Sequence, residues 1–516
     1  MIGQIEAVSP LRLKLANWLD GARLEQRLHR SLPLTAALTM ATLAIPYFKG
    51  FAPPAYLSCA LLIVLGVVPF ALREPPESRR TFVSIWLLAL MLRLILLVTV
   101  FDASLNAGGP FLGPDSNQFL SESQVMADQG FKLGAHPIAV FETYDVAHYY
   151  IYAFLIRAFG ADLFALQLFN TGLTAIAAAL MFSVARIALP RWAVVYGLVV
   201  AINPSLMVLS IKDLLKDPSI MFAVAAAVWA VVHMSSPAPW SSRVAYGAVG
   251  SLALSYIHMD RFYVAAYFEI AAAVLLAVLL WRAPSRIRLN VLVPLVAVFV
   301  ICESVPMAVG WPSTPSILVE QVRFVSRTRS MLVGDDEGLA QRALRSREEL
   351  RAKARRRGAG RITTLDDAAS AGAGFGVSMV KRLFGPFIWI APPAWTVREL
   401  LRGDYMLYPG TLVWYFVLPL AAIGCAATLR RIVQRKEAAP LLVALTAFCV
   451  LYFLQFLVIK LSYRQRDVMF PFWALFAFIG VPFVFDNPRW TRLFAIYWIG
   501  LAGFAVAHLI LRAFLA

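Results

Sequence analysis

Apolar residues fill most of the chain in stretches of about twenty, separated by short polar connections. A helix crosses the hydrocarbon core of a bilayer in roughly 20 residues, so each such stretch predicts a transmembrane helix. About thirteen stretches qualify, covering residues 32–48, 54–72, 81–101, 162–186, 192–210, 218–235, 244–257, 263–281, 290–308, 408–428, 439–459, 468–486 and 493–512. The pattern therefore predicts an all-α polytopic membrane protein.

Two segments do not fit the simple spanning pattern. Residues 1–31 are basic, with apolar positions at helical spacing, which predicts an amphipathic helix on the inner membrane face. Residues 144–160 are short and aromatic and carry His148 and Arg157, so we interpret them as a helix packed at the membrane surface. If that segment crossed the membrane instead, the orientation of everything after it would invert.

Composition agrees with a membrane protein. Hydrophobic residues make up 60% and charged residues 15% of the 516 residues, whereas a soluble domain is roughly 45–50% apolar. This excludes an ordinary soluble or disordered protein, and the net charge of +17 is better explained by membrane topology than by nucleic acid. The four cysteines lie in apolar stretches without a CxxC motif, so neither a disulfide framework nor a zinc site is indicated.

The distribution of Lys and Arg predicts the topology. With residues 144–160 outside the membrane, and with the long loop 311–405 left out of the count, one set of connections carries more than twice as many basic residues as the other, which places that set and the N-terminus in the cytoplasm. The long loop is itself rich in Arg, but loops beyond about 60 residues largely escape this charge rule. The predicted organisation is then a cytoplasmic segment 1–31, a transmembrane region 32–310 with a first outer loop at 102–161, a large outer loop 311–405 and a second transmembrane region 406–516. The outer side, with its long loops and ionisable turns, is where we expect a site.

The first outer loop supplies a candidate acid. Asp115 follows a Gly- and Pro-rich stretch and stands at the start of a predicted helix. It could cap that helix, or it could serve as a general base or metal ligand at the membrane surface.

The turn SIKDLLKDPSIM holds two Lys-Asp pairs, Lys212–Asp213 and Lys216–Asp217. Asp217 precedes a proline, as expected of a helix N-terminus. Capping does not account for four charges in six residues, and such a group suits a phosphate or a cation shared with Asp115.

The turn YIHMDRFY places His258, Asp260 and Arg261 between two short spans. Asp260 and Arg261 predict an interfacial salt bridge, and Arg261 is a further candidate for phosphate binding. Within the span 81–101, Arg93 requires a cavity or an acidic partner, for which Glu269 is the candidate.

The last outer turn, KLSYRQRDVMFPF, offers Tyr463, Arg464 and Arg466. Guanidinium groups on the side that should be poor in positive charge indicate a bidentate phosphate site. Snorkelling of these side chains at the interface is the alternative. No P-loop, dinucleotide fingerprint or hydrolase motif occurs in the sequence.

Together these motifs resemble the GT-C membrane glycosyltransferases, such as the lipid A aminoarabinose transferases and the protein O-mannosyltransferases. The resemblance covers residues 81–235 and rests on LRLILL, GPDSNQF…ADQG, RAFG, LQLFNTGLTAIAAALMFSVAR and the KDP turn, with a weaker match at RQRD…FP…G. It implies a GT-C-like bundle that transfers a sugar from a polyprenyl-phosphate carrier to a glycan, lipid or protein acceptor. It also implies a bacterial inner-membrane protein with its site on the periplasmic face.

The resemblance implies roles for the candidate residues. Asp115 maps onto the first-loop acid that acts as base or organises the site, and Asp217 maps onto the second acid, with Asp213 as its competitor. Arg464, Arg466 and Lys212 or Lys216 map onto the basic residues that hold the carrier phosphate. A Mg or Mn ion bound by Asp115 and Asp217 is an open possibility, because the sequence has Asp-Ser where many relatives have two acids.

The mechanism expected is an inverting single displacement in which Asp115 takes the acceptor proton and basic residues stabilise the departing phosphate. His258, Asp260 and Tyr463 remain further candidates. The rival class is a lipid-linked oligosaccharide polymerase or ligase. A transporter or flippase and a non-catalytic scaffold are more distant alternatives.

Overall fold

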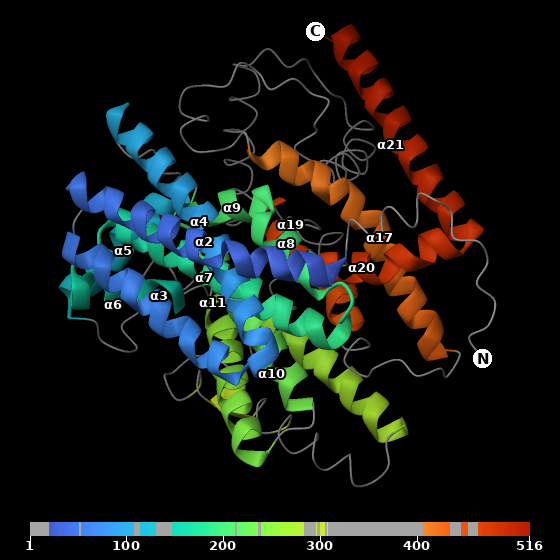
Figure 1. Cartoon of the computed structure of the whole chain (residues 1–516), viewed down its shortest axis with the longest axis horizontal. Coiled ribbons are helices and arrows are strands. Elements are labelled where there is room, and N and C mark those ends of the chain that lie inside the picture. Colours follow the sequence, from blue (N-terminus) through green and yellow to red (C-terminus); the bar gives the residue numbers. More distant parts are fainter. Residues whose placement is uncertain are drawn as a thin grey trace, which may run out of the picture.

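The computed structural model consists of helices, and no strand occurs in the part of the chain that it describes (Figure 1). The described residues are 20–50, 53–107, 114–130, 147–211, 214–235, 239–282, 296, 300–304, 307, 406–433, 445–452 and 463–515. The outer loop predicted at 311–405 and most of the spans predicted at 290–308 and 439–459 lie outside these residues.

Seven helices are long and apolar enough to cross a membrane, and one bent pair raises the number to eight, counted over the described residues. They correspond to predicted spans, and the membrane-integral, all-helical character is confirmed. The full number of thirteen spans stays a prediction.

Three long helices begin the described chain: α2 (Gly21–Phe48), α3 (Pro53–Arg73) and α4 (Pro76–Asn106). Asp20 caps α2 by accepting a hydrogen bond from the Ala22 backbone N–H at 3.1 Å. The helix then continues without a break past residue 31, where the sequence predicted the amphipathic segment to end. The segment after residue 20 therefore belongs to a candidate span.

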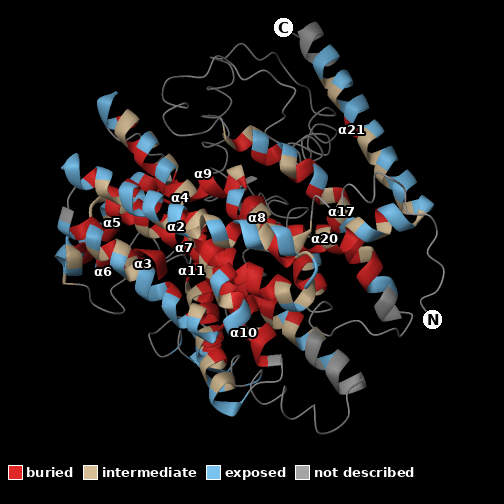
Figure 2. Ribbon diagram, in the orientation of Figure 1, coloured by how far each residue is buried: buried red, intermediate tan, exposed pale blue. Residues whose placement is uncertain are grey.

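The core of the bundle is α7 (Leu163–Ala188) with α10 (Asp217–Ser235), and 89% of the span window in each is buried (Figure 2). Helix α7 packs against α3, α4, α8 (Ala193–Ile202) and α10. Its run of small residues lets these neighbours approach closely, as in other membrane helix packing. Lipid contact is therefore left to the peripheral helices.

A buried polar cluster links the C-terminal parts of α7 and α10. Glu74, between α3 and α4, accepts hydrogen bonds from Ser183 and Ser78, and it lies 3.4 Å from Arg186. Ser183 in turn lies 2.9 Å from His233 Nε2. Four helices are thus held by one carboxylate that would otherwise be an unpaired buried charge.

Helices α8 and α9 (Pro204–Ile211) form an apolar pair bent by 46°, with the geometry of a broken span or a re-entrant loop. Pro204 cannot continue the helix, and Asn203 accepts a hydrogen bond from the Leu206 backbone N–H at 3.0 Å. Arg93, fully buried in α4, donates to the Ala201 carbonyl at 2.7 Å beside the bend. The expected pairing of Arg93 with Glu269 is wrong, because Nη1 of Arg93 donates to the backbone carbonyls of Ala89 and Ala201 instead.

Helix α11 (Trp240–Arg282) breaks at Arg261, whose backbone has φ −148° and ψ 72°. The sequence predicted a turn there between two spans, at 244–257 and 263–281. The break is also where charged side chains of this helix gather.

The C-terminal region comprises α17 (Leu407–Val433), α19 (Tyr463–Val468), α20 (Phe470–Asp486) and α21 (Pro488–Leu515). Helices α17 and α20 approach so closely at Gly424 and Gly480 that a Cβ on either would overlap backbone of the other helix. Helix α21 extends from the body with only 6% of its window buried (Figures 1 and 2).

Two shorter helices complete the described N-terminal half, α5 (Pro114–Asp128) and α6 (Ala147–Phe159). With 13 residues, α6 is too short to cross a bilayer. It packs against α5, α3 and α11, which agrees with a helix that lies beside the spans.

Candidate functional site

The centre of the candidate site is an ion pair between Asp217 and Arg261. Asp217 is the first residue of α10, and Arg261 stands at the break in α11, which packs against α10. The guanidinium donates a hydrogen bond to the carboxylate, and each side chain is only 5% exposed. Two charges removed from water to this degree require each other, so the pair fixes the start of α10 to the break in α11.

Beside it, His148 in α6 and Asp260 in α11 form a second buried pair. Nδ1 of the imidazole lies 2.6 Å from the Asp260 carboxylate, and neither side chain is exposed. The predicted salt bridge between Asp260 and Arg261 is therefore wrong, since each of these neighbours pairs with a residue of a different helix. Because α6 follows a long loop, sequence reasoning noticed His148 only as an unusual residue in residues 144–160.

The charges around Asp260 favour its ionised form. Burial alone would raise the pKa of this carboxyl at the break in α11, but His148 and the positive charges of Lys216 and Arg261 hold the pKa below its usual range. Lys216 and Asp217 are consecutive residues, so the second Lys-Asp pair of the sequence reaches both buried pairs. We refer to His148, Lys216, Asp217, Asp260 and Arg261 as the charged cluster.

Polar side chains hold the turn between α9 and α10 in place. Tyr152 and Asn170 both donate to the Leu215 carbonyl, at 3.0 and 3.1 Å. Gln167 donates to the Ile211 carbonyl at 3.2 Å. Helices α6 and α7 thereby satisfy backbone groups that the turn leaves without helical partners, and the turn is fixed beside the charged cluster.

Helix α19 brings the predicted RQRD motif to the same region. Arg466 Nε donates to Asp467 at 3.0 Å, and the guanidinium lies 5.3 Å from the ring centroid of Trp414. Helix α19 packs against α9 and α10. Burial raises the pKa of Asp467, and the nearby charge of Asp217 acts in the same direction against the lowering effect of Arg466.

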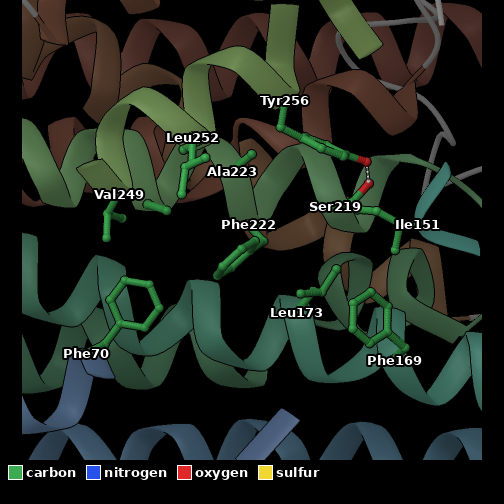
Figure 3. Close-up of a pocket in the computed structure, with 12 residues that line it drawn as sticks. Phe70, Ile151, Phe169, Leu173, Ser219, Phe222, Ala223, Val249, Leu252 and Tyr256 are labelled. Carbon is green, nitrogen blue, oxygen red and sulfur yellow. Dashed lines mark hydrogen bonds between the residues drawn. The ribbon is translucent and has the colours of Figure 1, made fainter. Parts of the chain in front are cut away.

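An apolar cavity of about 320 Å³ runs along α10, the helix that begins at Asp217 (Figure 3). At one end Tyr256 donates a hydrogen bond to Ser219 at 2.6 Å, two residues after Asp217. From there the cavity follows α10 to Phe70, lined by aromatic and aliphatic side chains. Leu252 in its wall is 66% exposed, so the cavity reaches the surface of the protein.

Some predicted residues lie outside what the structure describes. Lys212 and Asp213 belong to undescribed positions. Asp115, Tyr463 and Arg464 lie in described backbone, the first in α5 and the others in α19, but their side chains are not described. The structure thus brings together Lys216, Asp217, Asp260, Arg261 and the Arg466 helix, and it adds His148.

His258 belongs to a different group. Its Nδ1 lies 3.6 Å from Glu303, and donor atoms of His258, Glu269 and Cys302 lie within 4.8 Å of one another. These are donor types that metals accept, but the geometry alone does not indicate a bound ion. A metal at Asp115 and Asp217, which the sequence left open, is not tested by this arrangement, in which Asp217 pairs with Arg261.

No protein-family model and no curated protein sequence matches the chain.

Proposed function

We propose that the protein is an integral-membrane glycosyltransferase that moves a sugar from a polyprenyl-phosphate carrier to an envelope acceptor by an inverting single displacement. The observation that carries the proposal is the apolar cavity along α10, which Ser219 lines two residues after Asp217 of the charged cluster. A polyprenyl phosphate has the same two parts, an apolar tail and an anionic head. The proposed orientation puts this site on the periplasmic face of the inner membrane.

The cavity suits the tail of such a carrier. Ser219, Phe222, Ala223 and Ala226 lie along one face of α10 and line it together. From Ser219 to Ala226 the helix rises about 10 Å, so the cavity accepts the first part of a chain and not its whole length. The exposed Leu252 marks the side by which the remaining tail would pass into lipid.

The basic residues suit the phosphate. When the sugar leaves, the phosphate oxygen gains charge, and nearby cations stabilise that charge in a site shielded from water. Lys216 and Arg466 are the described candidates, with Arg464 and Lys212 as candidates from the sequence. Arg261 is engaged by Asp217, and we assign it to holding the site together rather than to a primary phosphate contact.

Helix α5 connects Asp115 to this site. Phe119, one helical turn after Asp115, packs edge-on against His148 with 4.5 Å between ring centroids. The N-terminal part of α5 therefore adjoins the charged cluster. This supports a role for Asp115 in the transfer, by taking the acceptor proton or by organising the acceptor.

The test is transfer by purified protein in nanodiscs, with extracts of polyprenyl-phosphate sugars and crude envelope acceptors. Asp115→Asn and Arg464→Ala should each abolish transfer without lowering protein yield. The matched control is Arg489→Ala, which removes an exposed arginine at the start of α21. Normal transfer by both site variants would contradict the proposal, and consumption of diphosphate-linked oligosaccharides would favour a polymerase or ligase.

A further inference from the structure

His148, which the sequence did not place among the candidate site residues, has the surroundings of a base. His148 is fully buried, and its Nδ1 is occupied by Asp260 at 2.6 Å. Its other ring nitrogen, Nε2, has no hydrogen-bond partner in the described part of the chain. A buried imidazole nitrogen without a partner is costly unless another molecule supplies one.

The Asp260 contact determines what Nε2 can do. A carboxylate that accepts from Nδ1–H fixes the tautomer in which Nε2 is unprotonated and able to accept a proton. The same carboxylate stabilises the imidazolium formed after proton transfer. The aromatic rings of Phe119, Tyr149 and Tyr152 surround the imidazole and fix its orientation.

We propose that His148 is the group that takes the proton of the acceptor hydroxyl, with Asp260 as its positioning residue. This assignment rests on the proposed glycosyltransferase function. It differs from the expectation from the sequence, in which Asp115 takes the acceptor proton. Asp115, near the N-terminus of α5, then organises the acceptor rather than deprotonating it.

The step balances without a further reactant. The acceptor oxygen forms a bond to the anomeric carbon of the sugar while its proton moves to His148 Nε2. The bond from that carbon to the phosphate oxygen breaks, and its electron pair leaves with the carrier phosphate. The imidazolium later releases the proton to water, which restores the starting state.

Charged groups and hydroxyls that act on this pair come from α6, from α11 and from the turn before α10. Lys216 from the turn before α10 and Arg261 from α11 act on Asp260 as positive charges. The hydroxyls of Tyr152 in α6 and Tyr256 in α11 lie close enough to interact electrostatically with Asp260. The cations offset the carboxylate charge in part, and the direct contact to His148 remains the strongest favourable one.

Two substitutions distinguish a catalytic role of His148, as the proton acceptor, from a structural role as the hydrogen-bond partner of Asp260. His148→Asn keeps an N–H donor at the position of Nδ1, so it preserves the contact to Asp260 but removes the basic nitrogen. His148→Gln places its amide near the position of Nε2 and loses that contact. His508→Gln in α21 is the control for removal of a histidine elsewhere.

Transfer kinetics and thermal stability are measured for each variant in nanodiscs between pH 5 and 9. His148→Asn should lower kcat by roughly 10²–10⁴-fold, with the KM for the carrier and the unfolding midpoint unchanged. Asp260→Asn should lower the plateau rate and shift the acid limb of the pH profile to lower pH, because the imidazolium loses its stabilising charge.

The outcomes are distinct. A wild-type kcat in His148→Asn, or a loss of activity that only follows a loss of stability, would overturn the base assignment while the glycosyltransferase proposal stands. An unshifted pH profile in Asp260→Asn would overturn the role given to that residue. Absence of transfer by the wild-type protein with every polyprenyl-phosphate sugar would overturn the proposed function and this assignment with it.

Discussion

Breaking the Asp217–Arg261 pair from one side should destabilise the bundle strongly. Asp217→Asn leaves a buried guanidinium without its counter-charge, and Arg261→Met leaves a buried carboxylate. Both side chains are 5% exposed, so water cannot replace the missing partner. The double substitution removes both charges, and most of the loss should then be recovered.

The magnitude follows from burial. Two unit charges 4 Å apart attract by about 4 kcal/mol at an effective dielectric constant near 20. Removal of one member of a buried pair costs about 3–5 kcal/mol, whereas replacing both by uncharged groups is often close to neutral. The contrast is Lys49–Asp102, a pair 43% and 30% exposed, for which Lys49→Met should cost about 0–1 kcal/mol.

The protein supplies its own reporter for this experiment. All four cysteines are buried, so a thiol-reactive fluorescent dye reacts when the helices separate on heating. The unfolding midpoint of the two single variants, the double variant and Lys49→Met would be compared in one detergent. The reasoning from burial would be refuted if the single variants had the unfolding midpoint of the wild type. It would also be refuted if the double variant lowered the midpoint by the sum of the two single effects.

Two further predictions concern helix packing and the cavity. Gly424→Ala should lower the unfolding midpoint, because its Cβ would overlap the Phe476 carbonyl. Gly503→Ala in α21 should leave the midpoint unchanged, because its Cβ meets open space. Equal midpoints for the two variants would contradict the close approach of α17 and α20. Ala226→Phe, which fills part of the cavity, should raise the KM for polyprenyl-phosphate sugars several-fold and change the free energy of unfolding by no more than about 1–3 kcal/mol. An unchanged KM measured in nanodiscs would exclude the cavity as the tail site.

Much of the architecture could be predicted from the sequence because a membrane helix satisfies its own backbone and needs only an apolar stretch of sufficient length. The segments at 81–101, 162–186 and 218–235 became α4, α7 and α10 for this reason. The bend at Pro204 also follows from local chemistry. The extent of α2 did not, since the helix that Asp20 caps continues through Pro33 without a break.

The pairing of charged side chains could not be predicted in the same way. The sequence placed Asp217, Asp260, Arg261 and Arg466 on the predicted outer side of the membrane. It paired residues that are neighbours in the chain, as in the predicted salt bridge between Asp260 and Arg261. The structure joins Asp260 to His148, which is 112 positions away, and Arg93 to a carbonyl rather than to Glu269. A buried charge takes whichever partner the packing of helices brings within reach.

The sequence by itself determined that this is a helical membrane protein with ionisable turns, because hydrophobicity and charge act over single segments of the chain. Only the tertiary structure decided that His148 belongs with those turns and that an apolar cavity along α10 ends beside them. Both depend on the contacts of α6, α7, α10 and α11, which are far apart in the chain. No local pattern of residues encodes such contacts, since they arise from how the helices pack together.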